Sequence, residues 1–233
     1  MSNALRLPAA ILAHTGTLPM ETESIGRSGA DVFLIGDMYL KIAPAGTLAR
    51  SARAQEYFHQ KGLSAPLLAF EQDAERDYLL VRAVPGRYAC DQALMSRPER
   101  LARTLGETVR MLHETAFSDC PLSCANERAL MAYEKEAGAL FPGDVSILRH
   151  DALIHGDMCL PNIFYDEAYR FTGFIDLGDA GPGDRHFDLY WALWSLSYNL
   201  KTDQYNNLFM DAYGRDAFDP ARFEVCAAIS KGV

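Results

Sequence analysis

Three polar side chains stand at fixed intervals in an otherwise apolar segment of the sequence. Asp157 follows a His-Gly pair, Asn162 lies five residues later, and Asp176 lies a further fourteen residues along, at the end of "FTGFID". Carboxylate and amide oxygens are the ligands that a hard dication such as Mg²⁺ prefers. Asp157 is also a candidate base that would accept the proton of a substrate hydroxyl.

A β-hairpin would bring these side chains together. If residues 162–165 and 171–175 pair as antiparallel strands around "DEAYR", Asn162 faces Gly173 or Phe174 and Asp176 lies within one or two residues of it. The plain alternative is that each Asp or Asn forms a turn or caps a loop. The joint pattern favours a site, because H-G-D-x-x-x-x-N followed by I-D-x-G is how kinases space a base and two magnesium ligands.

Phosphoryl transfer also needs a phosphate-binding loop, and the segment "SIGRSGADVFLIGDMYLKIA" is the candidate. Gly26 and Gly29 precede a strand, a turn at Gly36-Asp37, and a second strand that carries Lys41. Backbone N–H groups beside glycines can approach phosphates closely, and a strand lysine can neutralise them. Glycines before a hairpin are more often plain turns. The order of loop, lysine, helix, H-G-D, Asn and Asp nevertheless matches the order in a kinase.

The elements that must position these residues differ between the two parts of the chain. Strands are expected in "DVFLIGD" and "MYLKIA" and twice in "APLLAFEQDAERDYLLVRAVPG", with a helix in "TLARSARAQEYFHQKG" capped by Thr47. Pro85-Gly86 marks the expected boundary. The sequence therefore predicts an α+β protein with a nucleotide-binding lobe, residues 1–84, built from a small antiparallel sheet and one helix.

Residues 85–233 are predicted to form a larger, mainly helical lobe with the catalytic and substrate-binding residues. The segment "RPERLARTLGETVRMLHETA" has one apolar stripe of leucines and a valine spaced three or four residues apart. Further helices are expected in four segments: "NERALMAYEKEAGAL", "DRHFDLYWALWSLSYNL", "TDQYNNLFMDAYG" and "DPARFEVCAAISKGV".

Composition limits the functional classes. The chain has 233 residues, 49% of them hydrophobic, and a formal net charge of −9, which argues against non-specific nucleic-acid binding. Its five cysteines are scattered and odd in number, which indicates neither a disulfide framework nor a zinc site. We find no convincing signal peptide and no apolar run of transmembrane length, so we expect a cytoplasmic protein that does not bind membranes.

The sequence resembles the aminoglycoside 3'-phosphotransferases, which are antibiotic-resistance kinases with a protein-kinase-like fold. The resemblance runs from about Ser24 to Gly214, and its strongest parts are "HGDMCLPNIF", "FTGFIDLGDAGPGDRHFDL", "YLKIA", "LLVRAVPG" and "DCP". It implies a two-lobe fold and transfer of the γ-phosphoryl group of ATP or GTP, with Mg²⁺, to the 3' hydroxyl of an aminoglycoside. We expect a monomer or weak dimer.

Carried over motif by motif, the resemblance assigns roles in the helical lobe. Asp157 would be the catalytic base, and Asn162 and Asp176 would be the magnesium ligands. His155 would support the loop, and Asp188 would be a buried acid that braces it.

The resemblance also assigns the nucleotide contacts. These are the loop at Gly26, Ser28 and Gly29, the adenine-stacking Tyr39, the phosphate-neutralising Lys41, the hinge backbone at Arg82 and Val84, and Glu56 as the partner of the lysine.

The departures from the family concern one phosphate contact, at Asp179, and the acceptor side of the site. Asp179 stands where the family generally has a basic residue, and the 33 residues between "DCP" and "HGD" are shorter than in the family by around two helices. Glu134, Glu136 and Asp144 are candidate acidic walls for an amine-rich substrate, or simply a solvated helix face. The end "CAAISKGV" also lacks the family's acidic and aromatic tail. Two alternatives therefore stay open: a kinase for another small hydroxylated molecule, and a catalytically inactive nucleotide-binding protein.

Overall fold

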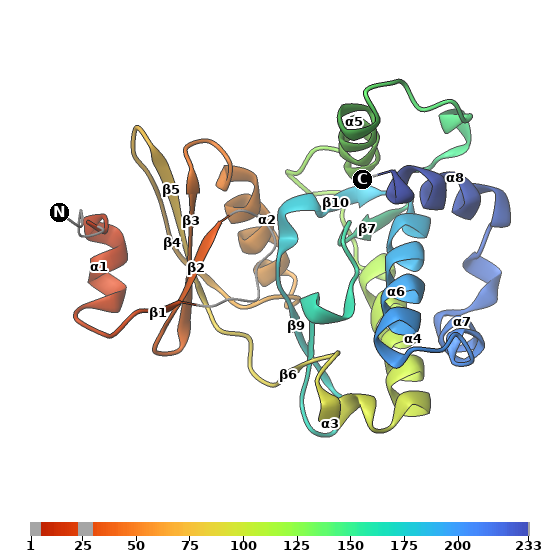
Figure 1. The fold of residues 1–233 in the computed structure, drawn as a ribbon, viewed down its shortest axis with the longest axis horizontal. Helices are drawn as coiled ribbons and strands as arrows, with labels where there is room; N and C mark the ends of the chain where they lie inside the picture. The colour runs from red at the N-terminus through yellow and green to blue at the C-terminus, as the bar shows by residue number, and fades with distance from the viewer. Residues whose placement is uncertain (1–5, 23–29, 233) are drawn as a thin grey trace. The chain divides into compact units, whose positions relative to one another are not determined.

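The computed structural model describes residues 6–22 and 30–232. The chain divides into two compact units, Met1–Val84 and Pro85–Val233 (Figure 1). The first unit is built around a sheet, and the second is mainly helical. In the described residues, no helix has both the length and the apolar character that crossing a membrane requires.

The first unit contains an antiparallel sheet with the strand order β1-β2-β3-β5-β4. Its strands are β1 (Glu21–Thr22), β2 (Asp31–Ile35), β3 (Met38–Pro44), β4 (Leu67–Gln72) and β5 (Arg76–Arg82). The predicted turn at Gly36-Asp37 is confirmed, because Ile35 pairs with Met38 across it and Gly36 has φ +62°. A two-residue hairpin turn of this kind requires positive φ, which glycine adopts without strain.

Helices cover both faces of this sheet, so the prediction of a single helix is wrong. Helix α2 (Ala49–Gln60) packs through Ala52 against one face, and α1 (Ala9–Thr15) packs through Ile11 against the other (Figure 1). The α1 segment buries only Ile11 and Thr15, which is too little for a recognisable helical stripe.

Thr47 does not cap α2, contrary to the prediction. The helix begins at Ala49, and the Thr47 hydroxyl donates to the Pro44 carbonyl. The buried Asp77 of β5 takes the capping role instead, since its carboxylate accepts from the N–H groups of Gly46 at 3.0 Å and Leu48 at 2.7 Å. A cap from a distant strand leaves no local sequence signal.

The second unit contains the helices predicted from the sequence. They are α4 (Pro98–Glu114), α5 (Ala125–Ala137), α6 (Arg185–Leu200), α7 (Asn206–Tyr213) and α8 (Pro220–Lys231). A short helix that was not predicted, α3 (Gln92–Met95), precedes them. The apolar stripe of α4 is fully buried at Leu101, Leu105, Val109 and Leu112. Figure 1 shows α4 and α6 side by side, with α7 against α4.

Short strands flank the segments that contain Asp157, Asn162 and Asp176. Strand β7 (Ala152–Ile154) pairs with β10 (Gly181–Gly183), and the other sheet has the order β6-β8-β9, formed by β6 (Arg87–Tyr88), β8 (Ile163–Tyr165) and β9 (Phe171–Phe174). Single 3-10 turns complete the unit: η1 (Val145–Ile147), η2 (Leu160–Asn162), η3 (Leu177–Asp179) and η4 (Arg215–Ala217).

The β8–β9 hairpin forms, but its register differs from the prediction. Ile163 pairs with Phe174, and the Asn162 carbonyl accepts from the Ile175 N–H at 3.0 Å, so Asn162 faces neither Gly173 nor Phe174. A bulge shifts the pairing, because Phe164 pairs with Gly173 whereas Tyr165 pairs with Phe171. Asp176 therefore follows directly the residue that is bonded to Asn162.

Candidate active site

The loop from β7 to η2 holds the predicted base, and its shape depends on one glycine. Gly156 has φ +84°, and a Cβ atom there would lie 2.6 Å from the Asp179 carbonyl oxygen. An L side chain is therefore excluded both by backbone conformation and by the close approach of η3. Gly156 fixes the direction in which the chain enters Asp157, which is half-buried.

Asp188 of α6 holds this loop through hydrogen bonds to its backbone. One carboxylate oxygen accepts from the His155 N–H and the other from the Gly156 N–H, each at 2.8 Å. His113 of α4 also contacts Asp188, at 3.2 Å from its Nε2, and its Nδ1 lies 2.9 Å from the Tyr213 hydroxyl. Asp188 is fully buried, so these partners satisfy a carboxylate that water cannot reach.

Asn162 is bonded directly to Asp157. Its Nδ2 donates to the Asp157 carboxylate at 2.9 Å and to the Asp157 main-chain carbonyl at 3.0 Å. Both amide hydrogens are thereby used, and the amide oxygen is directed away from the Asp157 carboxylate. Asn162 thus holds the Asp157 carboxylate and presents an oxygen for another partner.

Asp176 joins the same cluster through the residue before it. Besides the Ile175 N–H bond to Asn162, the Ile175 carbonyl lies 2.9 Å from His155 Nε2. This contact of the fully buried His155 ties the Asp157 loop to the end of the hairpin. Asp176 itself has φ +57°, a left-handed conformation that is uncommon for a residue other than glycine. Such strain tends to persist at functional sites.

This donor set fits a magnesium ion. The Asn162 amide oxygen and the Asp176 carboxylate would hold it, and both are hard oxygen ligands. Among the described residues, no group of three or more His, Cys, Asp and Glu side chains is arranged to hold a metal. Two protein ligands agree with Mg²⁺, which usually binds one or two carboxylates together with substrate phosphates and water.

Tyr39 and Lys41 share one face of the sheet in the first unit. They alternate along β3 with the buried residues Met38 and Leu40, so both point to the opposite face from α1 and both are half-buried. Their role as nucleotide contacts stays a prediction.

The other predicted nucleotide contacts are Arg82, Val84, Glu56 and the loop at residues 26–29. The Arg82 N–H donates to the Pro66 carbonyl at 3.1 Å, and Val84 is buried. Glu56 lies on the exposed side of α2, whereas Ala52 one turn earlier packs on the sheet. The loop residues Gly26, Ser28 and Gly29 lie outside the described residues.

Asp179 has a partner that the sequence did not reveal. Arg128 of α5 donates from Nη2 to the Asp179 carboxylate at 2.9 Å. The two residues are 51 positions apart, and neither belongs to a recognisable local motif. A basic group is therefore present beside η3, although it comes from a helix and not from the loop itself.

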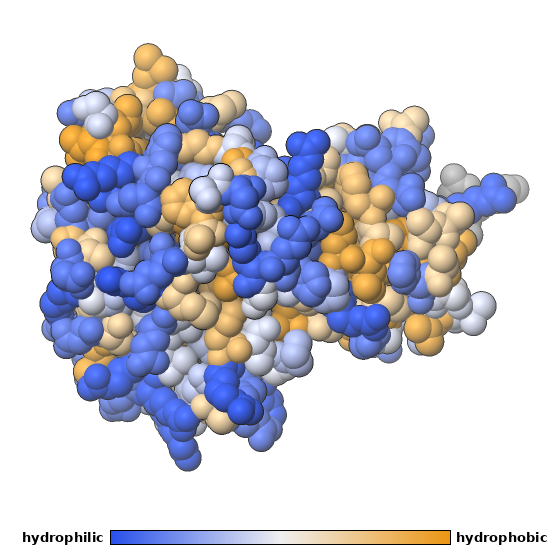
Figure 2. Space-filling model, turned by 180° about the vertical axis from the view of Figure 1, so that it is seen from behind, coloured by the Kyte–Doolittle hydropathy of each residue, from blue (hydrophilic) through white to orange (hydrophobic). Residues whose placement is uncertain are grey.

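The segment that contains Glu134, Glu136 and Asp144 is only weakly acidic. Glu136 and Asp144 are exposed, Glu134 is half-buried, and the Asp144 carboxylate caps η1 by accepting from the Ser146 N–H. Exposed apolar side chains share this segment, namely Met131 at 67% and Leu140 at 80% exposure. Figure 2 shows apolar groups gathered over α5 and the segment that follows it, at the upper left.

Known proteins are similar to this chain in sequence. The profile of the phosphotransferase enzyme family matches residues 24–226. A probable aminoglycoside 3'-phosphotransferase from Lactococcus lactis is 39% identical over 208 residues, which cover 80% of this chain and 79% of that protein. An aminoglycoside 3'-phosphotransferase from Niallia circulans is 27% identical and covers 91% of this chain and 92% of its own length.

Solved structures agree on the fold. An aminoglycoside phosphotransferase from Streptomyces rimosus, solved with ADP and streptomycin, superposes with a TM-score of 0.75 at 22% identity, covering 96% of both chains. A type VIII aminoglycoside-3'-phosphotransferase gives a TM-score of 0.73 at 23% identity, covering 96% of this chain and 98% of its own. The predicted α+β, protein-kinase-like fold is thereby confirmed. The chain is a member of the phosphotransferase enzyme family.

Proposed function

We propose that this enzyme transfers the γ-phosphoryl group of ATP or GTP to the 3' hydroxyl of an aminoglycoside and so confers resistance. The relatives from Lactococcus lactis and Niallia circulans support the acceptor class. The observation that carries the chemistry is the hydrogen bond from Asn162 to Asp157, because it joins a proton acceptor to a candidate metal ligand in one cluster.

In this reaction Asp157 accepts the proton of the acceptor hydroxyl while the oxygen bonds to the γ-phosphorus. The bond from the γ-phosphorus to the bridging oxygen breaks, and a nucleoside diphosphate leaves. Asn162 keeps the Asp157 carboxylate in place, and Asp188 prevents the loop from moving away during the transfer. Most of the rate enhancement comes from such positioning, since phosphoryl transfer needs little covalent work from the protein.

Asn162 and Asp176 would hold Mg²⁺, which supplies charge neutralisation on the phosphates when it is bound. On the nucleotide side, Lys41 would neutralise phosphate charge and Tyr39 would stack on the adenine. Gly26, Ser28 and Gly29 would approach the phosphates, Arg82 and Val84 would provide backbone contacts, and Glu56 would orient Lys41. The first unit, residues 1–84, would thus bind the nucleotide, and residues 85–233 would bind the acceptor and perform the chemistry.

The weakly acidic segment around α5 favours a second candidate, a kinase for another small hydroxylated molecule. Amine-rich antibiotics favour acidic surroundings, whereas this segment exposes Met131 and Leu140. In either case we place the enzyme in the cytoplasm, where nucleotides are available, as a monomer or weak dimer.

A product assay distinguishes the two candidates. Purified protein with Mg²⁺ and ATP or GTP is incubated with kanamycin, neomycin, streptomycin, choline and simple sugars, and products are identified by mass spectrometry. We expect one added phosphoryl group on kanamycin or neomycin at the 3' position. Phosphorylation of choline or a sugar alone would replace the first candidate by the second. Nucleotide binding with no turnover on any acceptor would indicate an inactive protein.

A further inference from the structure

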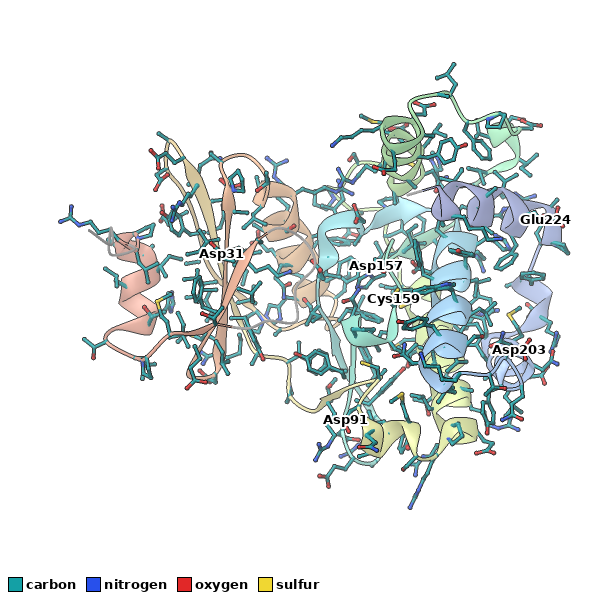
Figure 3. All side chains as sticks on the ribbon, viewed as in Figure 1. Asp31, Asp91, Asp157, Cys159, Asp203 and Glu224 are labelled. Atoms are coloured by element: carbon teal, nitrogen blue, oxygen red, sulfur yellow. The ribbon has the colours of Figure 1, made fainter. Side chains whose placement is uncertain are left out.

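Tyr213, at the end of α7, is joined to the residues that hold the Asp157 loop, although it has no part in the proposed transfer. It is 1% exposed, and its hydroxyl lies 2.9 Å from Nδ1 of His113 in α4. The two rings meet edge to face, with their centroids 5.6 Å apart. Figure 3 shows Asp157 and Asp203, which lies just before α7, on opposite sides of α6. Tyr213 therefore acts on Asp157 through the residues that lie between them.

A glycine of α4 lets α7 come close enough for this contact. A Cβ atom at Gly106 would lie 2.4 Å from the Phe209 carbonyl oxygen and 2.9 Å from the Tyr213 backbone nitrogen. Gly106 and His113 are about two helical turns apart, so they face the same side of α4. Arg110, on the turn before His113, donates from Nη1 to the Tyr213 carbonyl at 3.3 Å. The end of α7 is thereby fixed beside His113.

The hydrogen bonds run in one direction, from α7 towards the loop. A carboxylate can only accept, so His113 Nε2 carries a hydrogen and donates to Asp188 at 3.2 Å. In a neutral imidazole Nδ1 then lacks a hydrogen, and it accepts from the Tyr213 hydroxyl. Burial raises the pKa of Tyr213 to about 12, so this hydroxyl keeps its hydrogen at neutral pH. The side chains of His113 and Asp188 are fully buried, so bulk water does not replace either partner.

We propose that Tyr213 is a positioning residue, which fixes the His113 ring so that its Nε2–H stays directed at Asp188. Asp188 passes this restraint to the loop, because its carboxylate accepts two backbone N–H groups there. One of them belongs to Gly156, the residue before Asp157. Without the hydroxyl the His113 ring turns more freely, and the orientation of the proposed base becomes less exact. The kinetic part of this proposal rests on the proposed phosphotransferase function.

Amide hydrogen exchange, followed by NMR, tests the restraint without any turnover. Tyr213→Phe removes only the hydroxyl, and the Gly156 N–H should then exchange about fivefold faster, the factor that corresponds to one modest hydrogen bond. Exchange of the Ile229 N–H, in the buried face of α8, reports opening of the whole unit and serves as the reference.

Tyr165→Phe is the matched control, because Tyr165 is also fully buried and its hydroxyl donates to Thr108 of the same helix α4 at 2.9 Å. We expect the ratio of the Gly156 to the Ile229 exchange rate to rise in Tyr213→Phe and to stay at the wild-type value in the control. An unchanged ratio in Tyr213→Phe, or an equal rise in Tyr165→Phe, would overturn the proposal.

Kinetics test the consequence for catalysis. Tyr213→Phe should lower kcat about fivefold and leave the KM for Mg-nucleotide unchanged, because it disturbs the loop and not nucleotide binding. In a His113→Leu background, which lacks both ring nitrogens, Tyr213→Phe should cause no further loss of kcat. Losses that multiply in the double variant, or an equal loss of kcat in Tyr165→Phe, would overturn the proposal. Absence of turnover in the wild type would count against the proposed function alone, and the exchange ratio would still decide whether Tyr213 restrains the loop.

Discussion

Asp188 holds the loop that precedes Asp157, and the effect of replacing it can be estimated from the structure. The carboxylate accepts two buried backbone N–H groups at 2.8 Å, from His155 and Gly156. Leaving a buried donor unpaired costs about 1–3 kcal/mol. Asp188→Ala leaves both donors unpaired and should therefore lower the free energy of unfolding by about 2–6 kcal/mol. This is a large part of the roughly 5–15 kcal/mol by which a typical protein is stable. Asp188→Asn keeps one acceptor oxygen and should cost about 1–3 kcal/mol.

Urea unfolding of wild type and Asp188→Asn at neutral pH measures this difference, with Asp203→Asn as an exposed control. We expect the midpoint of Asp188→Asn to fall clearly and that of the control to stay within error. The phosphotransfer rate should fall as well, because the Gly156 N–H loses its anchor and Asp157 is the next residue. A midpoint equal to that of wild type would refute the view that Asp188 carries the loop.

Two further predictions concern stability. Burial would raise the pKa of Asp184, but hydrogen bonds from His186 and Arg222 hold that pKa well below its ordinary value. The unfolded chain therefore takes up a proton from about pH 4 downward while folded Asp184 does not, so stability is lost as the pH falls. Urea midpoints followed from pH 7 to about pH 2.5 should decline less steeply in Asp184→Asn, and parallel declines would contradict this. Gly106→Ala should cost about 1–3 kcal/mol, because its Cβ would lie 2.4 Å from the Phe209 carbonyl and force α4 and α7 apart; an unchanged thermal midpoint would disprove that packing constraint.

The elements that the sequence predicted well are those with a strong local pattern. The α4 stripe, the Gly36-Asp37 hairpin and the spacing of Asp157, Asn162 and Asp176 are readable because period, turn chemistry and motif spacing are local properties. Helix α1 was missed because a seven-residue helix with one large buried side chain has no period to detect.

Other features depended on contacts between distant segments. Helix α2 is capped by Asp77, which lies 29 residues beyond Leu48 in the sequence, and not by the predicted Thr47. The β8–β9 bulge moved the expected partner of Asn162 by at least one residue, and no residue in "FTGFID" signals it. The pairing of Arg128 with Asp179 likewise joins α5 to η3 across the fold of the second unit. Such contacts are decided by tertiary packing, which local propensity does not encode.

We propose that Asp157 accepts the proton of the acceptor hydroxyl and that Asp176 binds the metal ion. Isothermal titration calorimetry of a non-hydrolysable ATP analogue, with and without Mg²⁺, tests this division in the Asp157→Ala and Asp176→Ala variants. We predict near wild-type Mg-nucleotide affinity with kcat lower by about 10²-fold or more for Asp157→Ala, and weakened Mg-dependent binding for Asp176→Ala. Equally weak Mg-nucleotide binding by both variants would contradict the assignment.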